Sequence, residues 1–181
     1  MAGLKRYVAL LRGINLGARN KIVMADLREL FEGLEAEDVT TYVQSGNVVF
    51  RSRAARAQLA GQIERQIAQD LDLEIRVLLR TNAELTKLVA GSPFAKAESD
   101  PLKLHVTFLG ATPAAARVRA LDETAFAPDR FRVAGAHVYL HTPNGYGRSK
   151  LSNAYFEKQL GVAATTRNWK TVTALADLAA A

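Results

Sequence analysis

The spacing of hydrophobic residues changes several times along the first half of the chain. Segments with extended or alternating apolar residues lie at 6–12, 38–52 and 73–80, and they are separated by segments in which apolar residues recur every three or four positions. The helical spacing predicts two helices, on the apolar positions Met24, Leu27, Leu30, Phe31, Leu34 and Leu59, Ile63, Ile67, Leu71. Ser45-Gly46 predicts a tight turn inside 38–52. The predicted order, β-α-β-β-α-β, is the ferredoxin-like plan.

The second half repeats this order after a linking helix over 81–91, which the capping box Thr81-x-x-Glu84 begins. A strand is predicted at 103–109, a helix at 112–122 with Pro113 in its first turn, and a hairpin at 130–142 around Gly135. A helix at 149–161 ends at Gly161, and a strand at 162–166 precedes a helix at 168–180. We therefore predict an α+β fold with an internal structural duplication: two tandem ferredoxin-like halves, residues 1–80 and 103–181, joined by a linking helix and loop at 81–102.

Composition narrows the class of protein. Of the 181 residues, 49% are hydrophobic and 23% charged, which is typical of a globular chain rather than a disordered one. Cysteine is absent, which excludes disulfides and thiolate metal sites. No apolar run suits a signal peptide or a membrane span, so we expect a cytoplasmic protein with no membrane partner. The net charge of +6 favours anionic partners, although a solvated basic surface explains it equally well.

Topology is expected to bring distant polar loops together in the first half. With strand order 4-1-3-2, the loop after the first strand lies beside the tip of the hairpin. This places Arg12, Asn15 and Lys21 next to Ser45 and Asn47.

The same order applied to the second half gathers Arg148, Ser149 and Lys150 with Arg167, Asn168 and Lys170, at helix starts where anions are favoured. These loops contain Gly and Asn, and the plainer interpretation is that such residues only form turns and cap helices.

Four segments of the chain resemble a known family. "LLRGINLGARNKIVMADL", "TTYVQSGNVVF", "LHVTFL" and "GRSKLSNAYFEKQLGVAATTRNWKTVTAL" are similar to bacterial proteins grouped as domain of unknown function 1697. The resemblance runs over nearly the whole chain. It implies a two-part ferredoxin-like α+β architecture and an intracellular bacterial setting, and it implies no activity, substrate or catalytic residue.

Metal binding, nucleophilic catalysis, phosphate-binding loops and RNA recognition each fit the sequence less well. His105, His137 and His141 could share one sheet face, but no carboxylate stands at a suitable spacing, so we predict no metal site. Ser45 and Ser149 lack a base held in line, and the Gly-containing loop at 12–21 lacks the ending of a phosphate-binding loop. The aromatic motif of RNA-recognition domains is missing.

Two hypotheses remain. The first is a site for a nucleotide, a phosphorylated metabolite or a nucleic-acid backbone, built from the basic loops. The second is a protein-interaction or structural module with no small ligand. Whether the protein is an enzyme stays open, because no acid, base or nucleophile is evident; no cofactor is expected, and the oligomeric state is not predicted.

Overall fold

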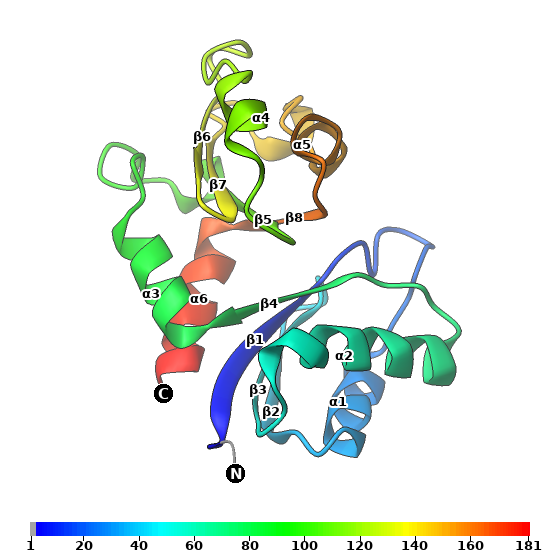
Figure 1. The fold of residues 1–181 in the computed structure, drawn as a ribbon. Helices are drawn as coiled ribbons and strands as arrows, with labels where there is room; N and C mark the ends of the chain where they lie inside the picture. Colours follow the sequence, from blue (N-terminus) through cyan, green and yellow to red (C-terminus); the bar gives the residue numbers. More distant parts are fainter. Residues whose placement is uncertain (1–2) are drawn as a thin grey trace. The chain divides into compact units, whose positions relative to one another are not determined.

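The computed structural model describes residues 3–181, which divide into two compact units (Figure 1). Unit 1 comprises residues 3–86 together with Leu175–Ala181, and unit 2 comprises Lys87–Ala174. Two helices therefore contribute residues to both units, because the divisions at 86 and 174 fall inside them. None of the helices formed by these described residues is long and apolar enough to span a bilayer.

The elements of the chain follow the predicted order. The first seven are β1 (Lys5–Leu11), α1 (Met24–Gly33), β2 (Glu37–Tyr42), β3 (Asn47–Ser52), α2 (Arg56–Leu71), β4 (Val77–Thr81) and α3 (Asn82–Ala90). After a 3₁₀ turn at Pro101–Lys103 come β5 (Leu104–Leu109), α4 (Ala115–Arg119), β6 (Arg130–Ala134), β7 (His137–His141), a 3₁₀ turn at Tyr146–Arg148, α5 (Asn153–Leu160), β8 (Ala164–Asn168) and α6 (Trp169–Ala180).

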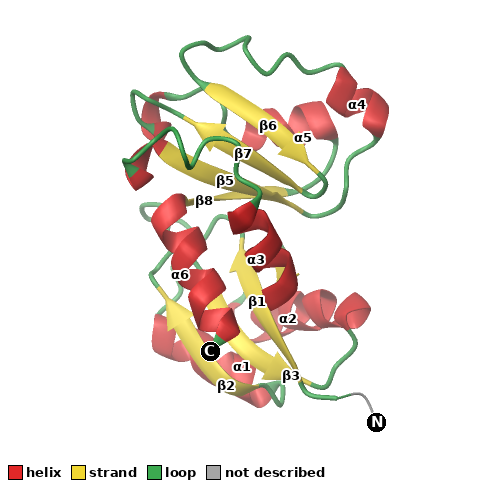
Figure 2. Cartoon of the chain, turned by 90° about the vertical axis from the view of Figure 1, so that its left-hand side faces the viewer, coloured by secondary structure: helices red, strands yellow, loops and turns green. Residues whose placement is uncertain are grey.

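The strands form two four-stranded sheets, one in each unit, and all neighbouring strands are antiparallel. The orders are β2-β3-β1-β4 and β6-β7-β5-β8, the same order in both units and the 4-1-3-2 order expected from the sequence. Figure 2 shows the strands of both sheets in yellow and the helices in red. The mixed α+β class, with two sheets and six α-helices among residues 3–181, is confirmed.

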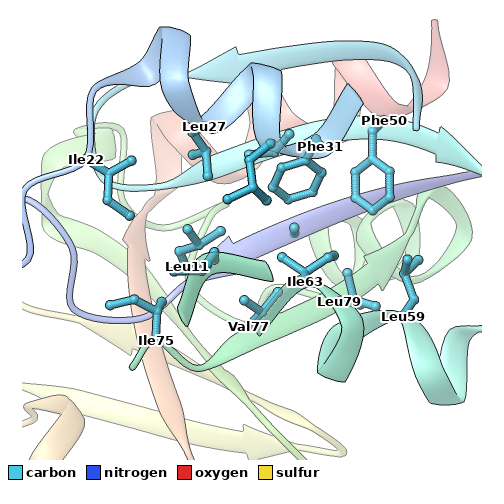
Figure 3. Packing of buried hydrophobic residues seen from close by; sticks show 14 of the residues in the cluster. Leu11, Ile22, Leu27, Phe31, Phe50, Leu59, Ile63, Ile75, Val77 and Leu79 are labelled. Carbon is cyan, nitrogen blue, oxygen red and sulfur yellow. The ribbon is translucent and has the colours of Figure 1, made fainter. Parts of the chain in front are cut away.

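One face of the first sheet packs against α1 and α2 (Figure 3). The helical stripe predicted on α2 is buried through Leu59, Ile63 and Ile67, and the ring of Phe31 from α1 meets Phe50 of β3 edge-on at 5.0 Å. Burying one such aliphatic side chain stabilises the fold by about 2 kcal/mol, so this interface accounts for much of the stability of unit 1.

The opposite face of the first sheet is also buried. Val8 and Leu10 alternate with the residues that face α1 and α2, and both are fully buried. Arg6 shares their face and donates a hydrogen bond to the carbonyl of Leu178 at 3.1 Å. The end of α6, which belongs to unit 1, therefore lies against this face and buries Leu175.

The second sheet packs one face against α5. Leu109, Val138 and Leu140 from the strands join Phe156 of α5, whose ring meets Phe131 of β6 at 5.4 Å. Figure 2 shows α5 behind this sheet. Because successive side chains of a strand point to opposite faces, Leu109 of β5 and Val138 and Leu140 of β7 define which residues face α5.

Several predicted boundaries are confirmed by their caps. Thr81 and Glu84 form the capping box, with Thr81 N donating to Glu84 Oε2 at 2.7 Å and Glu84 N donating to Thr81 Oγ1 at 3.3 Å. Gly161 ends α5 in the left-handed conformation at φ 71°. Gly135 turns the β6–β7 hairpin at φ 57°.

Other boundaries were predicted wrongly. α5 begins at Asn153 and not near 149, because Ser152 is its cap and accepts from Tyr155 N at 3.2 Å. α4 has only five residues and begins after Pro113, which lies outside its first turn. The turn between β2 and β3 takes four residues, Val43 to Gly46, rather than two.

Candidate functional site

The loop after β1 and the turn between β2 and β3 lie together, as the topology predicted. Leu11 N donates to the carbonyl of Gly46 at 2.8 Å. The side chain of Asn15 donates to the carbonyls of Gln44 at 2.7 Å and Ile22 at 3.2 Å, and it accepts from Ile22 N at 2.9 Å. We call residues 12–23 and 43–46 the loop–turn surface.

Gly46 is required where the turn meets the loop. Its φ is 88°, and a Cβ at this position would lie 2.7 Å from Cδ1 of the buried Ile14. Asn47 is fully buried beside it and donates to the carbonyl of Tyr42 and to Ser45 Oγ, both at 2.9 Å. The predicted residues Asn15 and Ser45 thus lie in the loop–turn surface, and the buried Asn47 supports it from below through Ser45.

The two predicted cations of this surface differ in their surroundings. Lys21 is exposed at the end of the loop. Arg12 is half-buried, and its backbone N–H donates to the carbonyl of Arg76 at 2.9 Å, which ties the start of the loop to the residue just before β4. Of this predicted set, Lys21 is the cation that faces solvent freely enough to meet a ligand.

In unit 2 the predicted loops also meet at one edge of the sheet. β7 ends at His141, opposite Leu104, and β8 ends at Asn168, opposite His105. Tyr146, in the loop after β7, stacks on the ring of His105 with centroids 4.6 Å apart. The loop that follows β7 therefore lies over the start of β5.

The six predicted residues at this edge have separate surroundings. Asn168 caps α6 and accepts from Thr171 N at 2.8 Å, while Lys170 is exposed on the first turn of α6. Ser149 does not cap α5 and instead accepts from Leu151 N at 3.1 Å. Arg167 is buried in β8, with only 6% of its surface exposed.

Arg148 and Lys150 line a surface depression of about 550 Å³. Its wall is formed by the loop before β6 and the loop after β7, through Ala125, Phe126, Ala127, Pro128, Asp129, Asn144, Gly145, Arg148 and Lys150. Both cations are exposed, and neither takes part in an ion pair within the described chain. The sequence did not point to Asp129 or Asn144, although Asn144 lies in the same Gly-containing loop.

Two buried arginines occupy equivalent places in the two sheets. Arg80 of β4 pairs with Val8 and Arg167 of β8 pairs with Val106, and each is followed by the cap of a helix. Arg80 donates to the carbonyl of Leu79 at 2.8 Å, and Arg167 donates to Thr165 Oγ1 at 2.7 Å. Desolvation by burial lowers the pKa of each to about 10, so both stay charged at neutral pH. No motif or spacing in the sequence pointed to Arg80.

The three histidines do not share one sheet face, which corrects the sequence-based expectation. His105 pairs with Leu140 and faces α5, whereas His137 and His141 alternate with Leu140 and face away. His141 Nε2 lies 2.9 Å from Glu98 Oε2, in a side chain that is 21% exposed. Residues 3–181 contain no group of three or more His, Cys, Asp or Glu side chains that could hold a metal.

His105 has an unusual environment for a titratable group. Its Nδ1 is buried without a hydrogen-bond partner among the described residues, and burial lowers the pKa of the imidazole to about 4. The ring is therefore neutral at physiological pH and packs as an aromatic side chain against Tyr146.

Comparison with known proteins gives the fold and a family. A solved structure described as the structure of conserved bacterial protein SP0830 from Streptococcus pneumoniae is 24% identical, covers 98% of this chain and 99% of its own, and superposes with a TM-score of 0.76. At this identity the likeness concerns the fold alone. No curated protein matches the sequence. The model of the protein family of unknown function DUF1697 matches residues 4–139, most of the chain, including the loop after β1 and the turn before β3. The chain therefore belongs to the DUF1697 family.

Proposed function

We propose that the protein is a cytoplasmic binder of a phosphate-bearing ligand, a phosphorylated small molecule or a nucleic-acid backbone, and that the depression in unit 2 is its site. The observation that carries the proposal is the pair of exposed cations, Arg148 and Lys150, in a hollow where neither has an ion-pair partner in the described chain. Cations that are not neutralised by the protein itself attract anions from solution.

The residues that line the depression suit a small phosphorylated molecule with polar groups. An arginine guanidinium can donate two parallel hydrogen bonds to phosphate oxygens, and a lysine ammonium adds a second charge. Asn144 and Asp129 supply an amide and a carboxylate that can bind hydroxyl groups of the ligand. A volume of about 550 Å³ lies in the usual range for small-molecule pockets, which favours the small ligand over a nucleic acid.

Four of the remaining predicted residues have structural roles instead. Arg167 is buried, and Asn168 is occupied as a helix cap. In the first unit the side chains of Asn15 and Asn47 donate hydrogen bonds to the carbonyls of Gln44 and Tyr42. We therefore limit the proposed ligand contacts to Arg148, Lys150, Asn144 and Asp129. No side chain here is assigned to catalysis.

We further propose that each half is ferredoxin-like and that the two arose by internal duplication. The shared strand order supports this, and so does the matched position of Arg80 and Arg167, each one residue before a helix cap. A cap and a buried arginine at the same register are local features that a duplication would carry over together.

Ligand binding can be tested by thermal shift and calorimetric titration with inorganic phosphate, adenosine monophosphate, ribose 5-phosphate and a labelled oligonucleotide. We expect a phosphorylated small molecule to raise the melting temperature and to bind the double variant Arg148→Ala, Lys150→Ala at least tenfold more weakly. Lys158→Ala is the matched control, because Lys158 is an exposed cation of α5 outside the depression.

The salt dependence of binding separates the two ligand classes. Nucleic-acid binding weakens steeply as salt rises, in proportion to the number of phosphates contacted, whereas a single phosphate in a pocket loses less. If none of the probes binds, or if Lys158→Ala weakens binding as much as the double variant, the proposal is wrong.

A further inference from the structure

Exposed aliphatic side chains gather on the loop–turn surface of unit 1. The large hydrophobic residues most exposed among residues 3–181 are Leu16 at 67%, Val23 at 64%, Val43 at 51% and Leu102 at 64%. Leu16 follows Asn15 in the sequence, Val23 follows Ile22, and Val43 precedes Gln44. The side-chain amide of Asn15 donates to the carbonyls of Ile22 and Gln44. This one amide therefore holds together the backbone segments that carry Leu16, Val23 and Val43.

Hydrogen bonds within the loop hold the backbone of the loop–turn surface in place. Asn15 N donates to the carbonyl of Asn20 at 3.0 Å, Asn20 Nδ2 donates to the carbonyl of Gly13 at 3.0 Å, and Arg19 N donates to the carbonyl of Leu16 at 3.2 Å. A loop tied by its own hydrogen bonds loses little conformational entropy when a partner binds, so its apolar side chains are already placed for contact.

The backbone of this surface is strained at Val43. Its φ of 49° lies in the left-handed region, where a β-branched residue is a true outlier. Asn15 and Asn20 also have positive φ, but Asn tolerates this conformation. A valine held there, half exposed to water, adds nothing evident to the stability of the turn, which suggests that its side chain is kept for contact with another molecule.

The charge of the surface is uniformly positive. Residues 11–25 carry Arg12, Arg19 and Lys21 and no acid, and residues 40–50 carry no charge. Arg19 and Lys21 are exposed and form no ion pair in the described chain. A partner that covers the aliphatic side chains must therefore bring negative charge to the rim.

We infer that the loop–turn surface docks a protein partner through an acidic segment that carries apolar side chains. The aliphatic residues Leu16, Val23 and Val43 form the apolar contact, and Arg19 and Lys21 pair with the acidic groups. A single-stranded nucleic acid fits less well, because its bases stack on aromatic rings and these contacts are aliphatic. An anionic membrane fits less well because aromatic anchors, usual in interfacial segments, are missing from residues 12–23 and 43–46. This inference is independent of the depression in unit 2.

The test is a selection of random twelve-residue peptides displayed on phage against the full-length protein. We expect the enriched peptides to combine Asp or Glu with apolar residues. Measured by fluorescence anisotropy, their binding should weaken at least tenfold in Leu16→Ser and in Val43→Asn, and severalfold in Lys21→Glu. Leu102→Ser is the matched control, since Leu102 is equally exposed but lies in unit 2, and it should bind as the wild type does.

Three results would overturn the inference. The first is that no enriched peptide is sensitive to Leu16→Ser. The second is that Leu102→Ser weakens binding to the same extent. The third is that Leu16→Ser abolishes the binding of phosphatidylserine vesicles or of an oligonucleotide, while no peptide binds the wild type in a way that depends on Leu16. Thermal melting of each variant confirms that it is folded, and Val43→Asn is expected to melt no lower than the wild type because Asn accepts the left-handed backbone.

Discussion

At the scale of single residues, Val43 is a position where stability and recognition are expected to oppose each other. Its left-handed backbone disfavours a β-branched side chain by about 1 kcal/mol or more. Val43→Asn should therefore raise the free energy of unfolding by about 1 kcal/mol, measured by urea denaturation. Val39→Asn, at a β2 position with no positive φ, serves as the comparison and should not stabilise. A Val43→Asn protein that is less stable than the wild type would show that the valine supports the turn.

His105 gives a second prediction at this scale, on the pH dependence of stability. Its folded pKa of about 4 lies below the ordinary value of 6.5, so the unfolded chain binds the proton more readily. The free energy of unfolding should therefore fall as the pH drops from about 6.5 to about 4. His105→Phe keeps the stacking on Tyr146 and removes the titrating group, together with the Nδ1 that has no hydrogen-bond partner among residues 3–181.

Between pH 6.5 and pH 4 the free energy of unfolding of His105→Phe should fall by less than that of the wild type. We expect the two losses to differ by about 2 kcal/mol, after allowance for the partial exposure of the ring. Urea denaturation at pH 7 and pH 4 measures the difference. Equal losses in the two proteins would mean that His105 is not the group responsible.

At the scale of secondary structure elements, the sequence predicts the periodic and capped parts best. The stripe on α2, the capping box of α3 and the glycine that ends α5 depend on residues within one element, and all three are confirmed. The start of α5 was misplaced because Ser149 and Ser152 both fit a cap. Leu151 lies between them and is fully buried, so tertiary packing sets the start of the helix after Leu151. A local sequence pattern does not contain this information.

For the candidate site, too, the sequence predicts one part of the arrangement and not the other. That the loops would meet followed from the strand order, which local pattern and crossover rules predict. Which side chains face solvent depends on the register between strands. Arg167 lies opposite Val106 on the face away from α5 and is buried, while Arg148 is the last residue of a 3₁₀ turn and is exposed. Register of this kind could not be obtained from the spacing of residues in one strand.

Arg167 provides the prediction at this scale. Arg167→Ala removes a buried side chain and its hydrogen bonds to Thr165 Oγ1 and to the carbonyl of Thr166, so we expect a loss of about 2 to 3 kcal/mol. Arg167→Met keeps most of the volume without the charge and should lose less. Binding of phosphate probes should not change in protein that remains folded. If Arg167→Ala abolishes binding while the fold is intact, Arg167 belongs to the site after all.

At the scale of the whole molecule, α3 and α6 each supply residues to both units. Unit 1 is not a continuous piece of chain, because it combines residues 3–86 with the seven residues Leu175–Ala181. These residues include Leu175 and Ala179, which are buried, and Leu178, whose carbonyl accepts from Arg6 of β1. The face of the first sheet that points away from α1 and α2 therefore depends on residues 175–181, far in sequence from β1.

Deleting residues 175–181 should consequently destabilise unit 1 more than unit 2. The deletion uncovers Val8 and Leu10 and removes Leu175, and the loss of this apolar burial is expected to exceed about 3 kcal/mol. Hydrogen exchange followed by mass spectrometry should show lower protection in β1 and β4, while β5 and β7, which are stabilised by α5, retain most of theirs. Asp177→Ser is the control, since it changes an exposed residue of the same segment and leaves the buried contacts in place. Protection lost first from β5 and β7 would mean that the end of α6 supports the second sheet rather than the first.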